Sequence, residues 1–129
     1  MSEKTIQTKI MLAASQAGAT VFRNNVGNGV LGQVIKQEGG QFHIVNGRRV
    51  QFGLCPGSSD LIGWRSVTVT PDMVGKSVSI FLALEVKSAT GRVSEEQENF
   101  IQAVRRAGGM AGVVRSVDEA IAVCNPLGM

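Results

Sequence analysis

Apolar and polar residues follow two rhythms along this chain, one with the period of a helix and one with the period of a strand. Near the N-terminus the apolar residues recur every three or four positions and predict a helix over residues 3–17. Ser2 is placed to cap this helix and Gly18 to end it. The segment "ATVFRNN" predicts a short strand directly afterwards.

The middle of the chain is rich in glycine and predicts a β-hairpin. The alternating runs "QFHIV" and "RRVQF" flank Asn46 and Gly47, which both tolerate a positive φ, so the hairpin turn is expected at this pair. After the turn "CPGSS", the segment "DLIGWRSVTVT" predicts another strand.

The rest of the chain predicts a strand, a helix, a strand and a last helix. "VSIFLALEVKS" is the clearest strand, and its unbroken apolar part predicts burial on both faces at the centre of a sheet. "SEEQENFIQAVRRAG" predicts a helix that a capping box of Ser94 and Gln97 opens. "MAGVVRS" predicts a strand, and Ser116 and Glu119 form a second capping box before the helix "SVDEAIAVC". This order predicts a single α/β domain over residues 1–129 with a βαβ crossover near its C-terminus.

Charged residues at the end of the clearest strand are the first sign of chemistry. Strand side chains alternate, so Glu85 and Lys87 share one face and Val86 points to the other. Ionised groups are costly in a buried strand unless they are paired or hold a metal. Asp60 opens another strand; beside Glu85 it would complete a set of oxygen ligands suited to Mg²⁺ or Mn²⁺. The alternative is a Glu85–Lys87 salt bridge, with Asp60 only capping a turn.

Composition narrows the classes of partner. A net charge of +3 and a pI near 9.2 mildly favour an anionic partner. The apolar share of 43% against 18% charged residues indicates either a large core or a surface that a second subunit covers. With one histidine and two distant cysteines, a Cys/His zinc site is excluded, and Cys55 and Cys124 are expected to be buried reduced thiols. The polar N-terminus and the short apolar runs predict a cytoplasmic protein without a membrane span.

Two stretches, "GSSDLIG" and "ALEVKSATGRVSEEQENFIQAVRRAGGMAGVVRS", resemble the VRR-NUC domain, a branch of the PD-(D/E)xK nuclease superfamily. The opening segments "EKTIQTKI" and "VFRNNVGNG" are also similar to that family. The resemblance implies a restriction-endonuclease-like core of order α-β-β-β-α-β, extended by a β-hairpin and a C-terminal helix. It also implies Mg²⁺-dependent hydrolysis of DNA, with Mn²⁺ as a substitute.

The resemblance also assigns roles to particular residues. Ser59 stands where the superfamily often has proline. For Gln97 the alternative is that it only closes the capping box, and for Glu3 that it only favours a helix N-terminus. The implied metal ligands are Asp60, Glu85 and the carbonyl of Val86, and the implied catalytic residues are Asp60, Glu85, Lys87, Gln97 and Glu3.

Other polar residues near these motifs are candidates for holding DNA phosphates, with solvated surface residues as the alternative. Arg48 and Arg49 of the hairpin are further candidates, although charges on strand edges also prevent aggregation. The lone His43 is expected to be structural. The phosphate candidates are Arg23, Asn25, Ser88 and Arg92, together with Asn24 beside Arg23.

The family resemblance further implies a homodimer, phage- or prophage-encoded, that acts on branched DNA such as four-way junctions in the bacterial cytoplasm. The glycine-rich region Val26–Leu54, or a neighbouring face, is expected to bury apolar surface in that dimer. Three alternatives remain open: a non-catalytic DNA-binding module on a nuclease fold, a structural or regulatory dimer, and a nuclease without junction preference.

Overall fold

The computed structural model describes residues 2–125. These residues form two compact units. The first holds the chain up to Ser15 and Val21–Gly63, and the second holds Gln16–Thr20 and the residues from Trp64 onward. The single domain expected over residues 1–129 stays a prediction.

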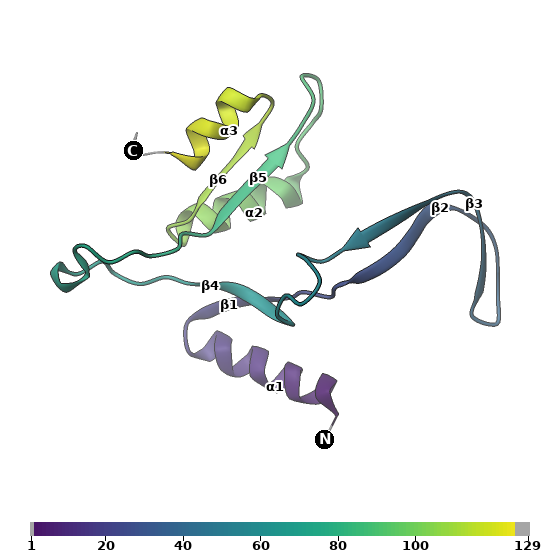
Figure 1. The fold of residues 1–129 in the computed structure, drawn as a ribbon, viewed down its shortest axis with the longest axis horizontal. Coiled ribbons are helices and arrows are strands. Elements are labelled where there is room, and N and C mark those ends of the chain that lie inside the picture. The colour runs from purple at the N-terminus through teal and green to yellow at the C-terminus, as the bar shows by residue number, and fades with distance from the viewer. Residues whose placement is uncertain (1, 126–129) are drawn as a thin grey trace. The chain divides into compact units, whose positions relative to one another are not determined.

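The described residues confirm the mixed α/β class, with helices and three small two-stranded sheets (Figure 1). The sheets pair β1 with β4, β2 with β3, and β5 with β6. The elements in chain order are α1 (Glu3–Gln16), β1 (Ala19–Arg23), β2 (Gly27–Glu38), β3 (Gln41–Phe52), β4 (Leu61–Arg65), the 3-10 turn η1 (Pro71–Met73), β5 (Leu82–Val86), α2 (Glu95–Arg106), β6 (Met110–Val114) and α3 (Val117–Cys124).

Helix α1 begins and ends with the signals that the sequence predicts. The Ser2 hydroxyl accepts a hydrogen bond from the Thr5 backbone N–H at 3.2 Å, which satisfies one of the free donors of the first turn. Gly18 follows the helix with φ of 94°, a conformation that glycine adopts without strain. The helix ends at Gln16, one residue before the expected end.

The hairpin of β2 and β3 turns at a different place from the one predicted. Its turn is Gly39–Gly40, with φ of 55° and 82°, because two consecutive positive φ values match the twist of the flanking strands. Asn46 also has a positive φ, 54°, but it lies inside β3. There Asn46 and Gly47 together face the single residue Gly32, so the pair forms a β-bulge instead of a turn.

The second unit contains the predicted βαβ crossover. Strands β5 and β6 are parallel, and α2 connects them. Ala111 of β6 packs with Ile101 and Val104 of α2, while the next residue, Gly112, contacts Val123 of α3. Helices α2 and α3 therefore lie on opposite sides of the two strands (Figure 1).

The predicted burial of β5 on both faces is wrong. Within residues 2–125, β5 pairs with β6 alone, and its Leu82 and Val86 side chains are 41% and 74% exposed, so β5 is no doubly buried central strand. The described core is small, so the apolar composition does not correspond to a large core. Its buried apolar residues are Ile101, Val104, Ala111 and Val114.

The cysteines and the last helix also differ from expectation. Cys55 and Cys124 are free thiols, as predicted, but both are exposed. The Ser116 hydroxyl accepts from the Glu119 N–H at 3.1 Å, yet the Glu119 carboxylate accepts from the Arg115 N–H at 2.6 Å instead of from Ser116. The second capping box is therefore only half formed, because the carboxylate binds the preceding N–H.

Candidate active site

Glu85 and Lys87 lie together at the C-terminal end of β5. The ladder to β6 pairs Glu85 with Val113, and the Lys87 N–H donates to the Val114 carbonyl at 3.1 Å, so the backbone of both residues is fixed. The Lys87 Nζ lies 3.4 Å from Glu85 Oε1, with the two side chains 20% and 30% exposed. The predicted sharing of one face is confirmed, and the ion pair is partly shielded from water.

Gln97 joins this pair from the first turn of α2. Its Nε2 donates to Glu85 Oε1 at 2.9 Å. Its Oε1 accepts from the Ser94 N–H at 2.9 Å, and its own N–H donates to the Ser94 hydroxyl at 3.1 Å. The sequence left a choice between a capping role and a site role for Gln97. In the structure one amide side chain makes both contacts.

These contacts orient the Glu85 carboxylate and leave part of it open. Oε1 forms the ion pair with the Lys87 ammonium and accepts the hydrogen bond from the Gln97 amide. Among the described residues, Oε2 makes no hydrogen bond or ion pair. A carboxylate oxygen with free lone pairs is a ligand that Mg²⁺ accepts. The arrangement thus offers a cation ligand beside a positioned ammonium.

Asp60 stands directly before β4, in a loop that the buried Asn24 holds. The Asn24 N–H donates to the Asp60 carbonyl at 2.8 Å. The Asn24 side chain donates to the Ser58 hydroxyl at 2.7 Å and the Ser59 carbonyl at 2.9 Å, and it accepts from the Leu54 N–H at 3.0 Å. Asn24 is only 8% exposed, so its inclusion among the phosphate candidates is wrong. Its amide is used to fix the loop that carries Asp60.

The carboxylate of Asp60 is exposed and has no hydrogen bond or ion pair within residues 2–125. Asp60 belongs to the first unit and Glu85 to the second. Across the described residues, no three His, Cys, Asp or Glu side chains form a group able to hold a metal. The donor chemistry of the two carboxylates fits Mg²⁺, and their sharing of one ion stays a prediction.

The two remaining implied site residues have different surroundings. Glu3 lies exposed in the first turn of α1, where an acidic side chain also stabilises the helix dipole. The Val86 side chain points to the face opposite Glu85, and its carbonyl as a metal ligand stays a prediction.

The candidate phosphate-binding residues fall in both units. The Arg23 guanidinium donates to the Thr8 hydroxyl at 3.1 Å, which links β1 to α1, and Asn25 is exposed. Ser88 and Arg92 are exposed in the loop between β5 and α2. Their binding to phosphate stays a prediction.

Arg115 is a residue near the site that the sequence gave no reason to choose. Its guanidinium donates to the Ser88 carbonyl, next to Lys87, and Gly91 donates to the same carbonyl at 3.2 Å. The loop after β5 is therefore held from the end of β6. The one available signal was the position of an arginine at the end of the apolar strand "MAGVV".

Comparison with known protein families identifies the family of this chain. The model of the VRR-NUC domain matches residues 32–118, about two thirds of the chain. The match includes Asp60, Glu85, Lys87 and Gln97, whereas Glu3 and the similar opening segments lie before it. No curated protein and no solved structure matches the chain significantly.

Proposed function

The chain belongs to the VRR-NUC domain family, whose members are nucleases, and from this we propose that it is a Mg²⁺-dependent endonuclease selective for branched DNA such as four-way junctions. Mn²⁺ is expected to replace Mg²⁺. Among the described helices, none has the length and apolar character that a membrane span needs.

The observation that carries the proposal is the set of contacts around Glu85. At the end of one parallel strand, the ammonium of Lys87 and the amide of Gln97 lie 3.4 Å and 2.9 Å from the same oxygen of the Glu85 carboxylate. A salt bridge with a purely structural role would gain little at this partly exposed position. The additional Gln97 contact fixes the rotamer of Glu85, which is what a metal ligand requires.

In the proposed mechanism, Asp60 and Glu85 would hold the ion through carboxylate oxygens, together with the carbonyl of Val86. When bound, Mg²⁺ supplies a Lewis acid that lowers the pKa of water and offsets negative charge on the phosphate. Lys87 orients the water that attacks phosphorus in line with the leaving oxygen. Its ammonium also stabilises the charge that the phosphate oxygens gain in the transition state. Gln97 keeps Glu85 in place.

The preference for branched DNA rests on charge and assembly. A net charge of only +3 favours recognition of DNA shape over tight binding to any duplex. We propose a two-fold homodimer, because apolar side chains of β2 and β3 such as Val34, Ile35 and Phe42 are half exposed or more. Two active sites related by a two-fold axis would nick symmetry-related phosphates of a four-way junction. Light scattering at micromolar concentration tests the assembly, and a 13.6 kDa species would contradict it.

The deciding experiment is a cleavage assay on linear, flapped, splayed and four-way DNA with Mg²⁺ and with EDTA. Asp60→Asn and Glu85→Gln each remove a ligand charge while preserving shape, and each should lower cleavage by at least about 100-fold, near 3 kcal/mol of barrier. Glu96→Gln is the matched control, since Glu96 is exposed in the first turn of α2 and outside the cluster.

The outcomes separate the alternatives. Full activity of Asp60→Asn or Glu85→Gln would refute the site assignment. Binding of DNA without any metal-dependent cleavage would identify a non-catalytic DNA-binding module. Equal cleavage of linear and junction DNA would leave a nuclease without junction preference.

A further inference from the structure

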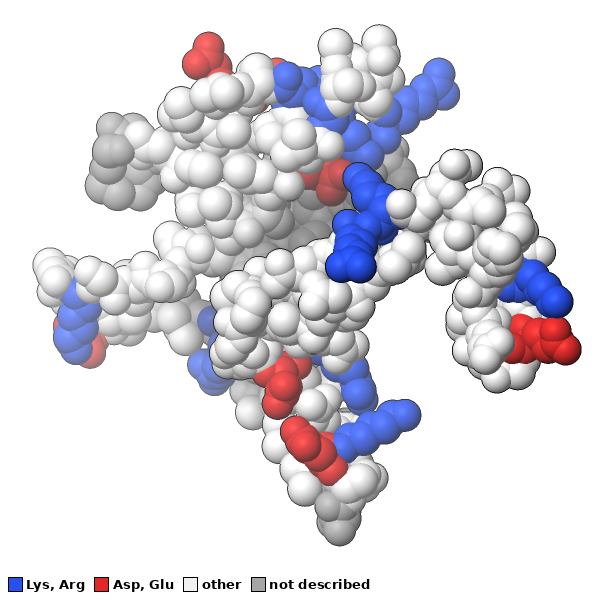
Figure 2. Space-filling model, turned by 45° about the vertical axis from the view of Figure 1, so that its right-hand side comes forward, with Lys and Arg blue, Asp and Glu red and all other residues white. Residues whose placement is uncertain are grey.

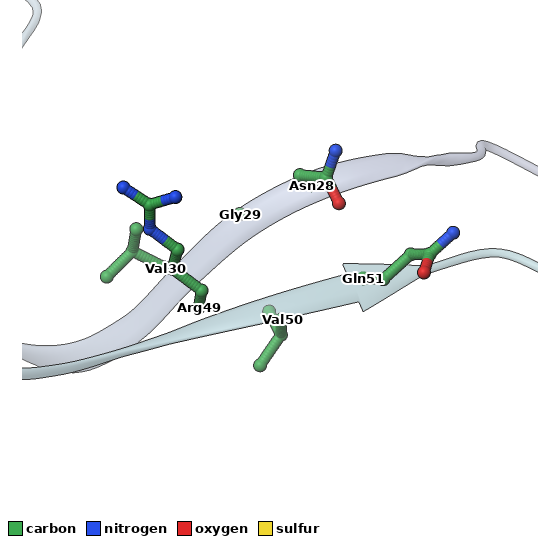
Figure 3. A pocket seen from close by; sticks show the side chains of 6 residues that line it. All are labelled: Asn28, Gly29, Val30, Arg49, Val50 and Gln51. Atoms are coloured by element: carbon green, nitrogen blue, oxygen red, sulfur yellow. The ribbon is translucent and has the colours of Figure 1, made fainter.

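The hairpin of β2 and β3 carries a shallow groove near its open end, away from the Gly39–Gly40 turn. We call it the Arg49 groove; its lining residues are Asn28, Gly29, Val30, Arg49, Val50 and Gln51 (Figure 3). All of them lie in the first unit, so the hairpin alone forms the groove.

The strand register brings the polar side chains of the groove to one face. Asn28 pairs with Gln51, and Val30 pairs with Arg49 two positions along. Directly opposed residues share a face, and so do residues two apart, so these four side chains lie on the same side of the ribbon. Figure 3 shows Val50 on the other side.

The groove is rich in hydrogen-bond donors that nothing in the described chain uses. The Arg49 guanidinium, with its five N–H donors, makes no ion pair or hydrogen bond within residues 2–125. The side-chain amides of Asn28 and Gln51 also have no partner there. A planar guanidinium on the same face as two amides is a suitable arrangement for an oxyanion, and for phosphate in particular.

The charge of the hairpin favours the same ligand. Lys36 and Glu38 form an exposed ion pair of 3.5 Å beside the turn, which leaves Arg48 and Arg49 as uncompensated cations on β3. Figure 2 shows Lys and Arg residues in blue and Asp and Glu residues in red, scattered over a surface made mostly of other residues. The hairpin is therefore a cationic ribbon that can attract a polyanion.

We propose that the Arg49 groove binds a backbone phosphate of DNA, with Arg49 as the principal contact and the amides of Asn28 and Gln51 beside it. A two-stranded ribbon has a width that the major groove accepts, and the two bulges of this hairpin increase its twist. The hairpin is then an arm that positions DNA. This proposal rests on the proposed function, because it assumes that DNA is the substrate.

The test measures binding of the full chain to a fluorescein-labelled four-way junction by fluorescence anisotropy in EDTA, where cleavage is suppressed. Arg49→Ala should raise Kd about tenfold and lower the slope of log K against log salt by about one, as expected for one lost phosphate contact. Arg49→Lys should restore the salt slope and only part of the affinity, because lysine cannot bind in bidentate fashion.

Arg48→Ala is the matched control. Arg48 is the neighbouring cation on the same strand, and its side chain points to the opposite face. It removes the same charge but leaves the groove intact, so it should weaken DNA binding clearly less than Arg49→Ala does. Circular dichroism verifies that each variant is folded.

Several results would overturn the proposal. Equal weakening by Arg48→Ala and Arg49→Ala would mean that only the net charge of the hairpin matters. Loss of the dimer in Arg49→Ala, by light scattering, would identify the groove as a subunit interface. Unchanged DNA binding by Arg49→Ala, in a protein that still cleaves DNA, would refute the phosphate-binding role of the groove but not the proposed nuclease function. A wild type without any DNA binding or cleavage would refute this proposal and the proposed function together.

Discussion

Asn24 holds the loop in front of Asp60, and its replacement by alanine gives a quantitative test of this part of the structure. Asn24→Ala removes three side-chain hydrogen bonds, to the Ser58 hydroxyl, the Ser59 carbonyl and the Leu54 N–H. Each such bond contributes about 0.5–1.5 kcal/mol net. Water can reach part of this exposed loop and replace some of these bonds, so we expect a loss in the lower half of the summed range, about 2–3 kcal/mol.

The assay is urea unfolding followed by far-ultraviolet circular dichroism. The slope of the free energy of unfolding against urea concentration should be the same in both variants, which checks two-state behaviour. Asn25→Ala is the matched control, because Asn25 is the adjacent asparagine and is exposed. It should change the free energy of unfolding by less than about 0.5 kcal/mol. Hydrogen exchange of the Leu54 amide should also accelerate in Asn24→Ala. Equal stabilities of the two variants would refute the role assigned to Asn24.

Three further substitutions test the roles of individual residues. Lys87→Ala should abolish most cleavage but keep most Mg²⁺ affinity in calorimetry, because an ammonium is no metal ligand; loss of metal binding would make Lys87 structural. Glu3→Gln should reduce cleavage modestly, and less than Glu85→Gln, since it lies in the first turn of a terminal helix; a wild-type rate would leave it only a helix-end charge. Arg115→Ala should destabilise the second unit by about 1 kcal/mol and slow cleavage by freeing the loop at Ser88, whereas equal behaviour to the wild type would show that the contact is dispensable.

Local signals predicted the elements well, because they act between neighbours in sequence. The caps at Ser2 and Ser94 and the βαβ crossover all appear where short-range patterns indicated them. The turn of the hairpin was predicted at the wrong position because two glycine-containing pairs could each form it. Both Gly39–Gly40 and Asn46–Gly47 tolerate positive φ, and only the full pairing of two long strands decides which one turns.

The candidate site was predictable where it follows from strand alternation and not where it depends on contacts between distant segments. Alternation alone places Glu85 and Lys87 on one face. The burial of Asn24 depends on a loop more than 30 residues away, and nothing in "RNN" distinguishes it from its neighbour Asn25. Arg115 likewise acts across 27 residues.

The double contact of Gln97 means that the order of α2 and the order of the Glu85 carboxylate cannot vary independently. A capping box ordinarily accepts glutamine or glutamate at this position with equal ease. Here a glutamate at position 97 would place a second negative charge beside Glu85 and remove the amide donor. The helix cap would tolerate this exchange, but repulsion from the Glu85 carboxylate would disfavour it. Fraying of the first turn of α2 would also release Glu85 from its fixed rotamer. The helix end and the site therefore form one cooperative element, and local unfolding of one disorders the other.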